Sequence, residues 1–358
     1  MSVPEVLVTG GTGALGRRVV ERFEGAGVGS RVLSRSGRPG TYKGDLITGE
    51  GLEQAVSGVD TIVHCASSPF RKARQTDVEG TKRLLAVAAG TGVSHLVYTS
   101  IVGIDRVQSY PYYRVKLETE RVIEGSPVLH TILRATQFYD LVLMAVRALA
   151  RLSVVPVPRG LVGQPIDTGE VADRMVELAL GAPAGRVPDV GGPEVRLIGD
   201  VVRTYLEVTR MRKKFLEFPL PGKTARAMRG GALTCPENRY GRIRWEEFLR
   251  KETVGKPGTS PLIGRRKHDR PGVCPGSPGR KGEGVTARGL VWMGVPTDDF
   301  GGTVAFFRDV MGLERFYGGE SVAVHRRHER GARSHQDSWY MLAGDSEEGR
   351  IPRMEVHE

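Results

Sequence analysis

A glycine-rich turn near the start of the chain is the feature that most constrains the fold. It reads Thr9-Gly10-Gly11-Thr12-Gly13-Ala14-Leu15-Gly16. The apolar run Val6-Leu7-Val8 before it predicts a buried strand, and the amphipathic stretch from Leu15 to Phe23 predicts a helix. A strand, a glycine-rich turn and a helix in this order form the context that a dinucleotide-binding fingerprint requires.

Each glycine has its own task in this interpretation. Gly10 turns the chain after the strand, Gly13 lets a pyrophosphate approach the backbone, and Gly16 lets the helix pack close to the sheet. The phosphates would lie on the unpaired N–H groups at the positive end of the helix. Because the chain contains 48 glycines, an ordinary strand–helix turn is the alternative interpretation.

Strand and helix patterns alternate over the following 120 residues or so. Further strands are expected at 30–35, just before Gly44, and at 59–67, 96–99 and 128–133. Further helices are expected at 78–89 and 112–124. This alternation predicts right-handed crossovers and an α/β fold with a Rossmann-type, doubly wound parallel sheet. Ligands of such sheets bind at the carboxyl ends of the strands.

Polar residues after the second and third strands bear on the choice of cofactor. NAD-binding proteins usually place an acidic residue near the adenosine ribose, but this chain has Ser34 and Arg35 there. An arginine suits a 2′-phosphate, so we favour NADP(H) over NAD(H), with an ordinary loop cation as the alternative. Asp45 either accepts a hydrogen bond from adenine or forms a turn. We interpret His64 and Cys65 as core residues and not as reactive groups.

Ser100, Tyr112 and Lys116 form a candidate catalytic group. Ser100 ends a predicted strand, while Tyr112 and Lys116 lie four residues apart and therefore on one face of a helix. A lysine ammonium beside the phenol, together with a cationic nicotinamide, is expected to lower the pKa of Tyr112. Ser100 would then hold a substrate oxygen while Tyr112 transfers its proton. A partly exposed helix face is the alternative.

With these motifs in place, residues 1 to about 252 resemble the short-chain dehydrogenase/reductase superfamily. They are most similar to its atypical, NmrA-like NAD(P)H-binding branch. The segments that carry the resemblance are 8–13, Asp77-Val78-Glu79-Gly80-Thr81, 97–103, 112–116, 133–138, 164–165, 169–172, 191–194 and 221–223.

The resemblance implies an NAD(P)H-dependent oxidoreductase acting on a carbonyl or quinone-like small molecule, with Ser100, Tyr112 and Lys116 as the catalytic trio. It also implies a set of cofactor contacts: Gly10, Thr12, Gly13, Ala14, Leu15, Gly16, Arg35, Asp45, Leu46, Ala66 and Thr136. Among these, the glycines would hold the pyrophosphate and Arg35 the 2′-phosphate. Asp45 and Leu46 would flank the adenine, Ala66 the ribose, and Thr136 the nicotinamide. Residues from about 140 to 252 would form a smaller substrate-facing part, in which Trp245 and Phe248 close against the core.

One position departs from the family pattern. Extended members of the superfamily often carry an asparagine, which helps to order a proton-relay water, where this chain has Asp77. NmrA-like relatives include redox sensors that bind the cofactor without turning it over. A non-catalytic NADP(H)-binding regulator is therefore the alternative function.

Composition limits the possible partners and the cell compartment. The net charge of +11 is compatible with a nucleic-acid partner. Much of the excess positive charge lies after residue 252, so we expect no nucleic-acid partner. The most apolar stretch, 141–157, is interrupted by Arg147 and Arg151, so we expect no membrane span. The N-terminus shows no signal-peptide pattern, and the three cysteines have no metal-type spacing, which predicts a reduced, cytoplasmic setting and no metal site. The sequence leaves the oligomeric state open.

The last third of the chain differs in composition. Residues 253–287 are rich in Gly, Pro, Lys and Arg, which predicts a disordered linker. A strand at 289–295 and a helix at 303–311 are expected next, and this run resembles the opening of a glyoxalase/bleomycin-resistance (vicinal oxygen chelate) module. Too few residues remain for such a module, so 288–358 is interpreted as a truncated α+β fragment, largely irregular after 317. A metal-dependent enzyme working through this tail is the weakest alternative.

Overall fold

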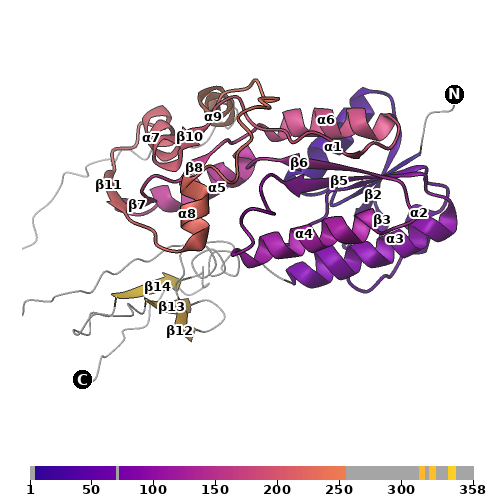
Figure 1. The fold of residues 1–358 in the computed structure, drawn as a ribbon, viewed down its shortest axis with the longest axis horizontal. Helices are drawn as coiled ribbons and strands as arrows, with labels where there is room; N and C mark the ends of the chain where they lie inside the picture. The colour runs from indigo at the N-terminus through magenta and orange to yellow at the C-terminus, as the bar shows by residue number, and fades with distance from the viewer. Residues whose placement is uncertain (1–4, 70–71, 255–313, 319–321, 328–337, 344–358) are drawn as a thin grey trace, which may run out of the picture. The chain divides into compact units, whose positions relative to one another are not determined.

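Seven strands, all paired in parallel, form the main sheet in this computed structural model (Figure 1). Their order is β3-β2-β1-β4-β5-β6-β9. They are β1 (Val6–Thr9), β2 (Ser30–Ser34), β3 (Tyr42–Lys43), β4 (Thr61–His64), β5 (His95–Ile101), β6 (His130–Ala135) and β9 (Gly185–Arg186). The order runs outward from β1 to β3 and then reverses to β4, which confirms the predicted doubly wound sheet. The short β9 was not predicted.

The structure describes residues 5–69, 72–254, 314–318, 322–327 and 338–343. The chain divides into two units, Met1–Thr253 and Val254–Glu358. Nearly all of the linker expected at 253–287 lies outside the described residues, as do the strand expected at 289–295 and the helix expected at 303–311. The domain boundaries inferred from sequence therefore stay predictions.

Helices cover both faces of the sheet (Figure 1). One face carries α1 (Ala14–Gly25) and α6 (Thr168–Leu180), and the other carries α2 (Leu52–Val56), α3 (Gly80–Thr91) and α4 (Pro111–Glu124). Alternation along β1 decides which residue faces which layer: Val6 and Val8 pack with α1 and α6, whereas Leu7 packs with the opposite helices. Burial on both faces explains why the strands read as continuous apolar runs.

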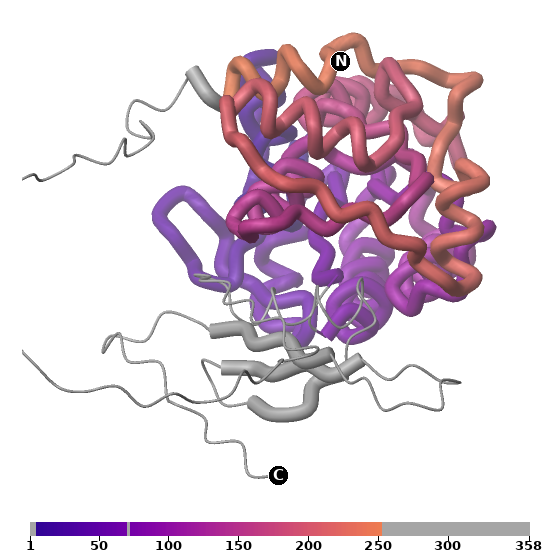
Figure 2. Tube along the Cα trace, turned by 90° about the vertical axis from the view of Figure 1, so that its left-hand side faces the viewer, coloured from indigo at the N-terminus to yellow at the C-terminus, as the bar shows by residue number. Residues whose placement is uncertain are grey.

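A smaller part lies at one end of the sheet, as the two views show (Figures 1 and 2). It contains α5 (Tyr139–Ala150), β7 (Val154–Pro158), β8 (Val162–Gly163), β10 (Arg196–Leu197), α7 (Ile198–Val208), β11 (Lys214–Phe218), α8 (Lys223–Arg229) and α9 (Trp245–Val254). Its own apolar cluster includes Trp245 and Phe248, which pack against Tyr139. Assigning all of 140–252 to this part was wrong, because α6 packs beside α1 and β9 joins the main sheet.

The second unit contains three described strands, β12 (Glu314–Gly318), β13 (Val322–Arg327) and β14 (Ser338–Ala343). They pair antiparallel in that order. Residues 322–327 and 338–343, which contain valine and aromatic residues that favour strands, are therefore regular, but most of the stretch after 317 lies outside the described residues, so its expected irregularity stays a prediction. Among the described residues of either unit, no helix is both long and apolar enough to cross a membrane.

His64, at the carboxyl end of β4, is a core residue as predicted. Its side chain is fully buried, with Nδ1 2.6 Å from Thr9 Oγ1 and Nε2 2.9 Å from Thr81 Oγ1. Burial, and secondarily the charge of Lys116, lowers the pKa of His64 from 6.5 to about 3. The folded chain therefore keeps this imidazole neutral at pH values where the unfolded chain protonates it.

We expect His64 to make the fold acid-sensitive. Because its pKa is lower in the folded state, its contribution is complete above pH 6.5 and is lost as the pH falls toward about 3. At 1.36 kcal/mol per pH unit the loss reaches at most about 5 kcal/mol. Urea denaturation at pH 7 and pH 4 should show a smaller acid loss for His64→Gln than for the wild type. His130→Gln, on the half-buried start of β6, serves as the control, and an equal acid loss in all three proteins would contradict this role.

Candidate functional site

The glycine-rich turn leaves the start of α1 open to a ligand. Gly10 has φ +67°, and a Cβ there would come within 2.7 Å of the Ala66 backbone. A Cβ on Gly16 would lie 2.2 Å from the Gly10 carbonyl oxygen, so Gly16 lets the helix approach the turn itself. Gly13 caps α1 without a side-chain hydrogen bond, and the first turn of this helix contains no acidic residue. The free N–H groups of this end suit an anion.

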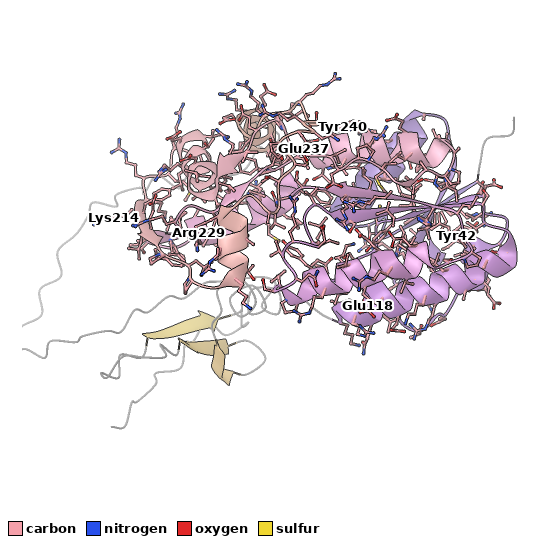
Figure 3. The ribbon with its side chains drawn as sticks, viewed as in Figure 1. Tyr42, Glu118, Lys214, Arg229, Glu237 and Tyr240 are labelled. Atoms are coloured by element: carbon pink, nitrogen blue, oxygen red, sulfur yellow. The ribbon has the colours of Figure 1, made fainter. Side chains whose placement is uncertain are left out.

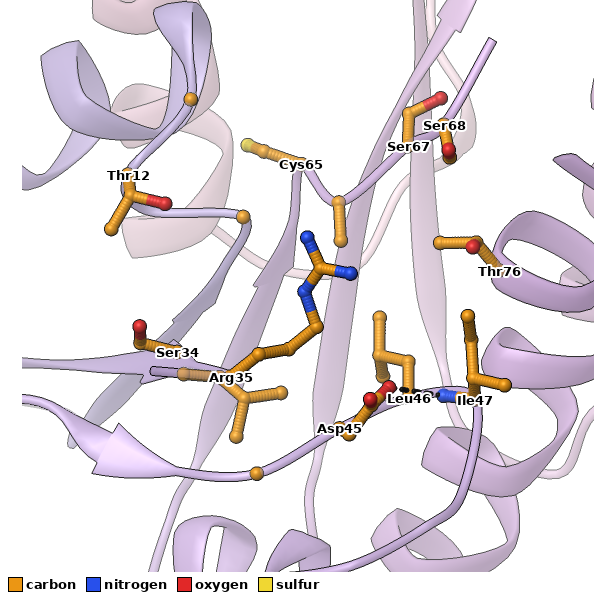
Figure 4. A pocket seen from close by; sticks show the side chains of 15 residues that line it. Thr12, Ser34, Arg35, Asp45, Leu46, Ile47, Cys65, Ser67, Ser68 and Thr76 are labelled. Atoms are coloured by element: carbon orange, nitrogen blue, oxygen red, sulfur yellow. Dashed lines mark hydrogen bonds between the residues drawn. The ribbon is translucent and has the colours of Figure 1, made fainter. Parts of the chain in front are cut away.

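The turn forms one wall of a pocket at the carboxyl ends of β1, β2 and β4. The residues that line it are Gly10, Thr12, Gly13, Leu33, Ser34, Arg35, Gly44, Asp45, Leu46, Ile47, Cys65, Ala66, Ser67, Ser68 and Thr76. Arg35 extends from the end of β2 into this pocket, toward the loop that carries Cys65 and Ser67 (Figure 4). A nucleotide fits this arrangement, because the glycines leave space at a helix N-terminus and the Arg35 cation also lines the pocket.

Most of the cofactor contacts predicted from sequence meet in this pocket. Asp45 lines the pocket, and its Oδ1 accepts a hydrogen bond from the Ile47 N–H (2.7 Å, Figure 4), as the turn-forming role requires; its hydrogen bond with adenine stays a prediction. Leu15 packs its side chain into the core, so only its backbone is available to a ligand. Thr136 is placed differently: it is buried, and its hydroxyl donates to the Gln164 carbonyl at 2.5 Å. Its contact with a nicotinamide stays a prediction.

Helix α4 presents Tyr112, Lys116 and Glu120 on one face, one turn apart. The Lys116 ammonium is buried and donates to the Thr99 carbonyl (2.9 Å). It also lies 4.0 Å from Asp77 Oδ1 and 4.2 Å from the centre of the Tyr98 ring. The Lys116 ammonium thus contacts a carbonyl, a carboxylate and the face of an aromatic ring, and these contacts together offset the cost of burying its charge.

Asp77 connects Lys116 to Tyr112 through a residue that the sequence did not single out. Both Asp77 oxygens accept hydrogen bonds, Oδ1 from the Ser67 hydroxyl (2.7 Å) and Oδ2 from the Ser68 N–H (3.0 Å). The Ser67 hydroxyl is in turn hydrogen-bonded to the Tyr112 hydroxyl. Tyr112, Ser67, Asp77 and Lys116 therefore form one polar chain beside the nucleotide pocket.

A π-helical turn, η1 (Arg74–Glu79), supplies Asp77. Such turns are rare in proteins, and those that occur often lie at functional sites. An ion pair between Arg74 of η1 and Glu118, labelled on α4 in Figure 3, ties this turn to the helix that carries Tyr112. The sequence signal at this point is Asp77 itself, which stands where extended members of the superfamily often carry an asparagine.

Ser100 faces the same side of the sheet as α4. It is two residues from Tyr98 on β5, and Tyr98 packs in the cluster that contains Ile123 of α4. Ser100 is only 1% exposed, and its Oγ has no hydrogen-bond partner among the described residues. A buried hydroxyl without a partner is costly. Ser100 does not line the pocket, and its contact with a substrate oxygen stays a prediction.

In the chain without cofactor, the pKa of Tyr112 is shifted in the direction opposite to the one expected from Lys116. The lowered pKa was predicted for a site that also holds a positive nicotinamide, so it stays a prediction for the cofactor-bound state. In the chain alone, burial and then the Asp77 carboxylate raise the pKa of Tyr112. Burial also lowers the pKa of Lys116, while Asp77 acts in the opposite direction.

Comparison with known proteins indicates NAD(P)H binding. A family model described as NAD(P)H-binding matches residues 10–180. A (4-alkanoyl-5-oxo-2,5-dihydrofuran-3-yl)methyl phosphate reductase from Streptomyces griseus is 30% identical over 53% of this chain and 68% of its own length. Photosystem II assembly factor Ycf39 from Cyanophora paradoxa is 29% identical over 38% of this chain and 46% of its own length, so the chain spans about half of that relative.

Solved structures share the fold. An NADPH-dependent quinone oxidoreductase from Escherichia coli has a TM-score of 0.57 at 15% identity, with 69% of this chain and 99% of that chain covered. A short-chain dehydrogenase/reductase superfamily protein from Agrobacterium tumefaciens, with bound NAD, has a TM-score of 0.56 at 18% identity, with 70% and 96% covered. The strand order and the glycine-rich turn agree with these similarities, and the chain belongs to an NAD(P)H-binding family whose fold is shared with a protein of the short-chain dehydrogenase/reductase superfamily.

Proposed function

We propose that the chain is an NADP(H)-dependent oxidoreductase that reduces a carbonyl or quinone-like small molecule, with Tyr112 as the proton donor. The observation that carries this proposal is the polar chain Tyr112–Ser67–Asp77–Lys116 at the edge of the nucleotide pocket. The phosphate reductase from S. griseus and the NADPH-dependent quinone oxidoreductase from E. coli support it as relatives that carry out reductions.

Each group of residues has a separate role in this proposal. The N–H groups at the start of α1 and the gap at Gly13 hold the pyrophosphate, and Arg35 meets the 2′-phosphate. Bound NADPH would supply a hydride. Ser100 Oγ donates a hydrogen bond to the substrate oxygen, and Tyr112 gives that oxygen a proton. Turnover of NADPH with a panel of aldehydes, ketones and quinones tests the proposal, and the absence of turnover with any of them would count against it.

A non-catalytic NADP(H)-binding regulator is the second candidate. Two observations favour it: Asp77 replaces the relay asparagine, and several relatives are photosystem II assembly factors. The two candidates share a cofactor site but differ in chemistry. NADPH binding without turnover of any carbonyl substrate would favour the regulator.

Arg35 is expected to set the preference for NADP(H). Arg35→Ala should weaken NADPH binding about 10- to 100-fold, because a charge-assisted hydrogen-bonded contact to the 2′-phosphate is lost. NADH binding should hardly change, since that cofactor lacks the 2′-phosphate. Fluorescence titration of the wild type and the variant with each cofactor measures both effects.

Arg38→Ala is the matched control for this experiment. Arg38 is an exposed cation three residues further along the same loop and does not line the pocket. This control should bind both cofactors as the wild type does. Equal NADPH and NADH affinity in the wild type would contradict the NADP(H) preference, and an equal effect of both variants would show a general charge effect instead of a specific contact.

A further inference from the structure

We infer that the smaller part of the chain docks on the surface of an anionic phospholipid bilayer. The docking surface consists of the basic turn at residues 210–214, between α7 and β11, and the outer face of the β7–β11 strand pair. Lys214, on β11, lies at the end of the smaller part that is farther from the main sheet (Figure 3). The inference is independent of the proposed function, because none of these residues lines the nucleotide pocket.

A hollow of about 880 Å³ lies in the surface where α7 ends and β11 begins. The described residues that line it are Arg203, Leu206, Glu207, Arg210, Met211, Arg212, Lys213, Lys214 and Phe215. Its apolar members belong to the apolar cluster of the smaller part or pack against it. Because five of the lining residues are cations and one is a carboxylate, the hollow attracts anionic groups.

Three of these cations are not used by the fold. The side chains of Arg210, Arg212 and Lys214 are exposed and pair with no carboxylate among the described residues. The other two cations are engaged, since Arg203 pairs with two carboxylates and Lys213 donates to a backbone carbonyl. A cation close to an anionic leaflet strengthens membrane binding about fivefold, so three unpaired cations in one turn favour such a surface.

Arg210 occupies a backbone position that favours glycine. Helix α7 ends in a Schellman motif, in which the Met211 N–H donates to the Leu206 carbonyl (2.8 Å) and the Arg210 N–H donates to the Glu207 carbonyl (3.0 Å). The φ angle of Arg210 is +54°, a conformation that strains an L side chain but not glycine. The fold alone therefore favours glycine here, and the arginine indicates a role for its charge outside the fold.

The strand pair beside the basic turn exposes apolar side chains. Lys214 lies opposite Val154 in the register of β7 and β11, and Leu216 follows two residues later on the same face. Leu216 is 57% exposed and Val154 is 40% exposed. The opposite face of β7 is covered, because Val155 and Val157 lie in the apolar cluster of the smaller part. The outer face is therefore aliphatic and has the unpaired cations at one end.

Aliphatic side chains beside unpaired cations fit a bilayer whose surface is negatively charged. The cations meet lipid phosphates and carboxylates, while Leu216 and Val154 enter the boundary between head groups and acyl chains. A nucleic acid would engage the cations but would leave these aliphatic side chains in water. An acidic protein is the occupant that the experiments below distinguish from a bilayer.

Sedimentation of the full chain with lipid vesicles tests the inference. We expect binding to phosphatidylcholine vesicles that contain about 30% phosphatidylserine. Binding should weaken as NaCl rises from about 0.1 M to about 1 M, because the Debye length falls from about 10 Å to about 3 Å. Equal binding to vesicles of phosphatidylcholine alone, or no binding to the anionic vesicles, would overturn the inference.

Arg210→Gly separates the charge from the fold. It removes a cation where glycine is favoured, so the urea midpoint should not fall, whereas the affinity for anionic vesicles should fall about fivefold. Lys72→Gly is the matched control, because Lys72 is the other non-glycine residue with a positive φ among the described residues, at +53°. It lies outside the docking surface and should bind as the wild type does. Equal losses in both variants would show an effect of net charge alone and overturn the inference.

Leu216→Ser tests the aliphatic part of the docking surface. It should lower vesicle affinity about 5- to 10-fold at both salt concentrations, since salt does not screen the insertion of an apolar side chain. Leu129→Ser is the control, because Leu129 is 62% exposed just before β6, and it should bind as the wild type does. Displacement from vesicles by polyglutamate, with losses in Arg210→Gly but none in Leu216→Ser, would assign the surface to an acidic protein and overturn the bilayer.

Discussion

Replacement of Tyr112 by phenylalanine is expected to lower kcat for carbonyl reduction by about 10²- to 10⁴-fold, the usual contribution of a positioned general acid. The substitution removes one hydroxyl and keeps the ring. The substrate oxygen then loses its proton donor, and Ser67 loses the partner that Tyr112 provides. NADPH binding should be nearly intact, because Tyr112 does not line the nucleotide pocket. Stopped-flow oxidation of NADPH and a fluorescence titration measure the two quantities.

Tyr113→Phe is the matched control for this substitution. Tyr113 is the neighbouring tyrosine on α4, and its ring packs edge-on against Tyr110 at a centroid distance of 4.8 Å. It takes no part in the chain from Ser67 to Lys116, so its removal should change kcat little. Wild-type turnover in Tyr112→Phe would exclude Tyr112 as the proton donor. Equal losses in both variants would instead point to a structural effect on α4.

The main sheet was predictable from the sequence because its strands are buried on both faces. A buried parallel strand must be apolar over several consecutive residues, and β1 and β4 show this directly. The two-residue strand β9 has no such signal, since a few backbone hydrogen bonds to β6 define it. The prediction that α6 belongs to the smaller part was wrong because the sequence shows an apolar helix face but does not show which layer of the fold that face covers.

Only those parts of the candidate site whose residues lie within one helix or strand, or at its end, could be predicted from the sequence. The glycine turn, Arg35 at a strand end, and Tyr112 four residues before Lys116 are all patterns within one element or at its end. Ser67 and Asp77 are ten residues apart, and their contact with Tyr112 depends on the π-helical turn of η1 and on how it packs against α4. No periodicity encodes that geometry. The contribution of Asp77 to the pKa of Tyr112 could not be predicted from the sequence for the same reason.

Replacement of Arg134 by alanine is expected to lower the free energy of unfolding by about 3–5 kcal/mol, the usual cost of breaking a buried ion pair from one side. Arg134 on β6 is 3% exposed and bonds both carboxylate oxygens of Glu120 on α4, at 2.8 and 2.5 Å. Its third nitrogen donates to Asp105 at 2.8 Å. Without the guanidinium, the Glu120 carboxylate would stay buried without the cation that pairs with it. Urea denaturation followed by circular dichroism measures the loss.

Two further variants separate the buried charge from the loss of packing. Arg186→Ala removes an arginine from a more exposed pair with Asp189, and we expect a loss below about 1 kcal/mol. The double variant Arg134→Met with Glu120→Leu removes both charges and refills the space, so it should be more stable than Arg134→Ala. A double variant that is as unstable as the single one would show that packing, and not the unpaired carboxylate, causes the loss. Because Glu120 shares its helix face with Tyr112 and Lys116, the double variant should also retain NADPH binding if its only effect is on this ion pair.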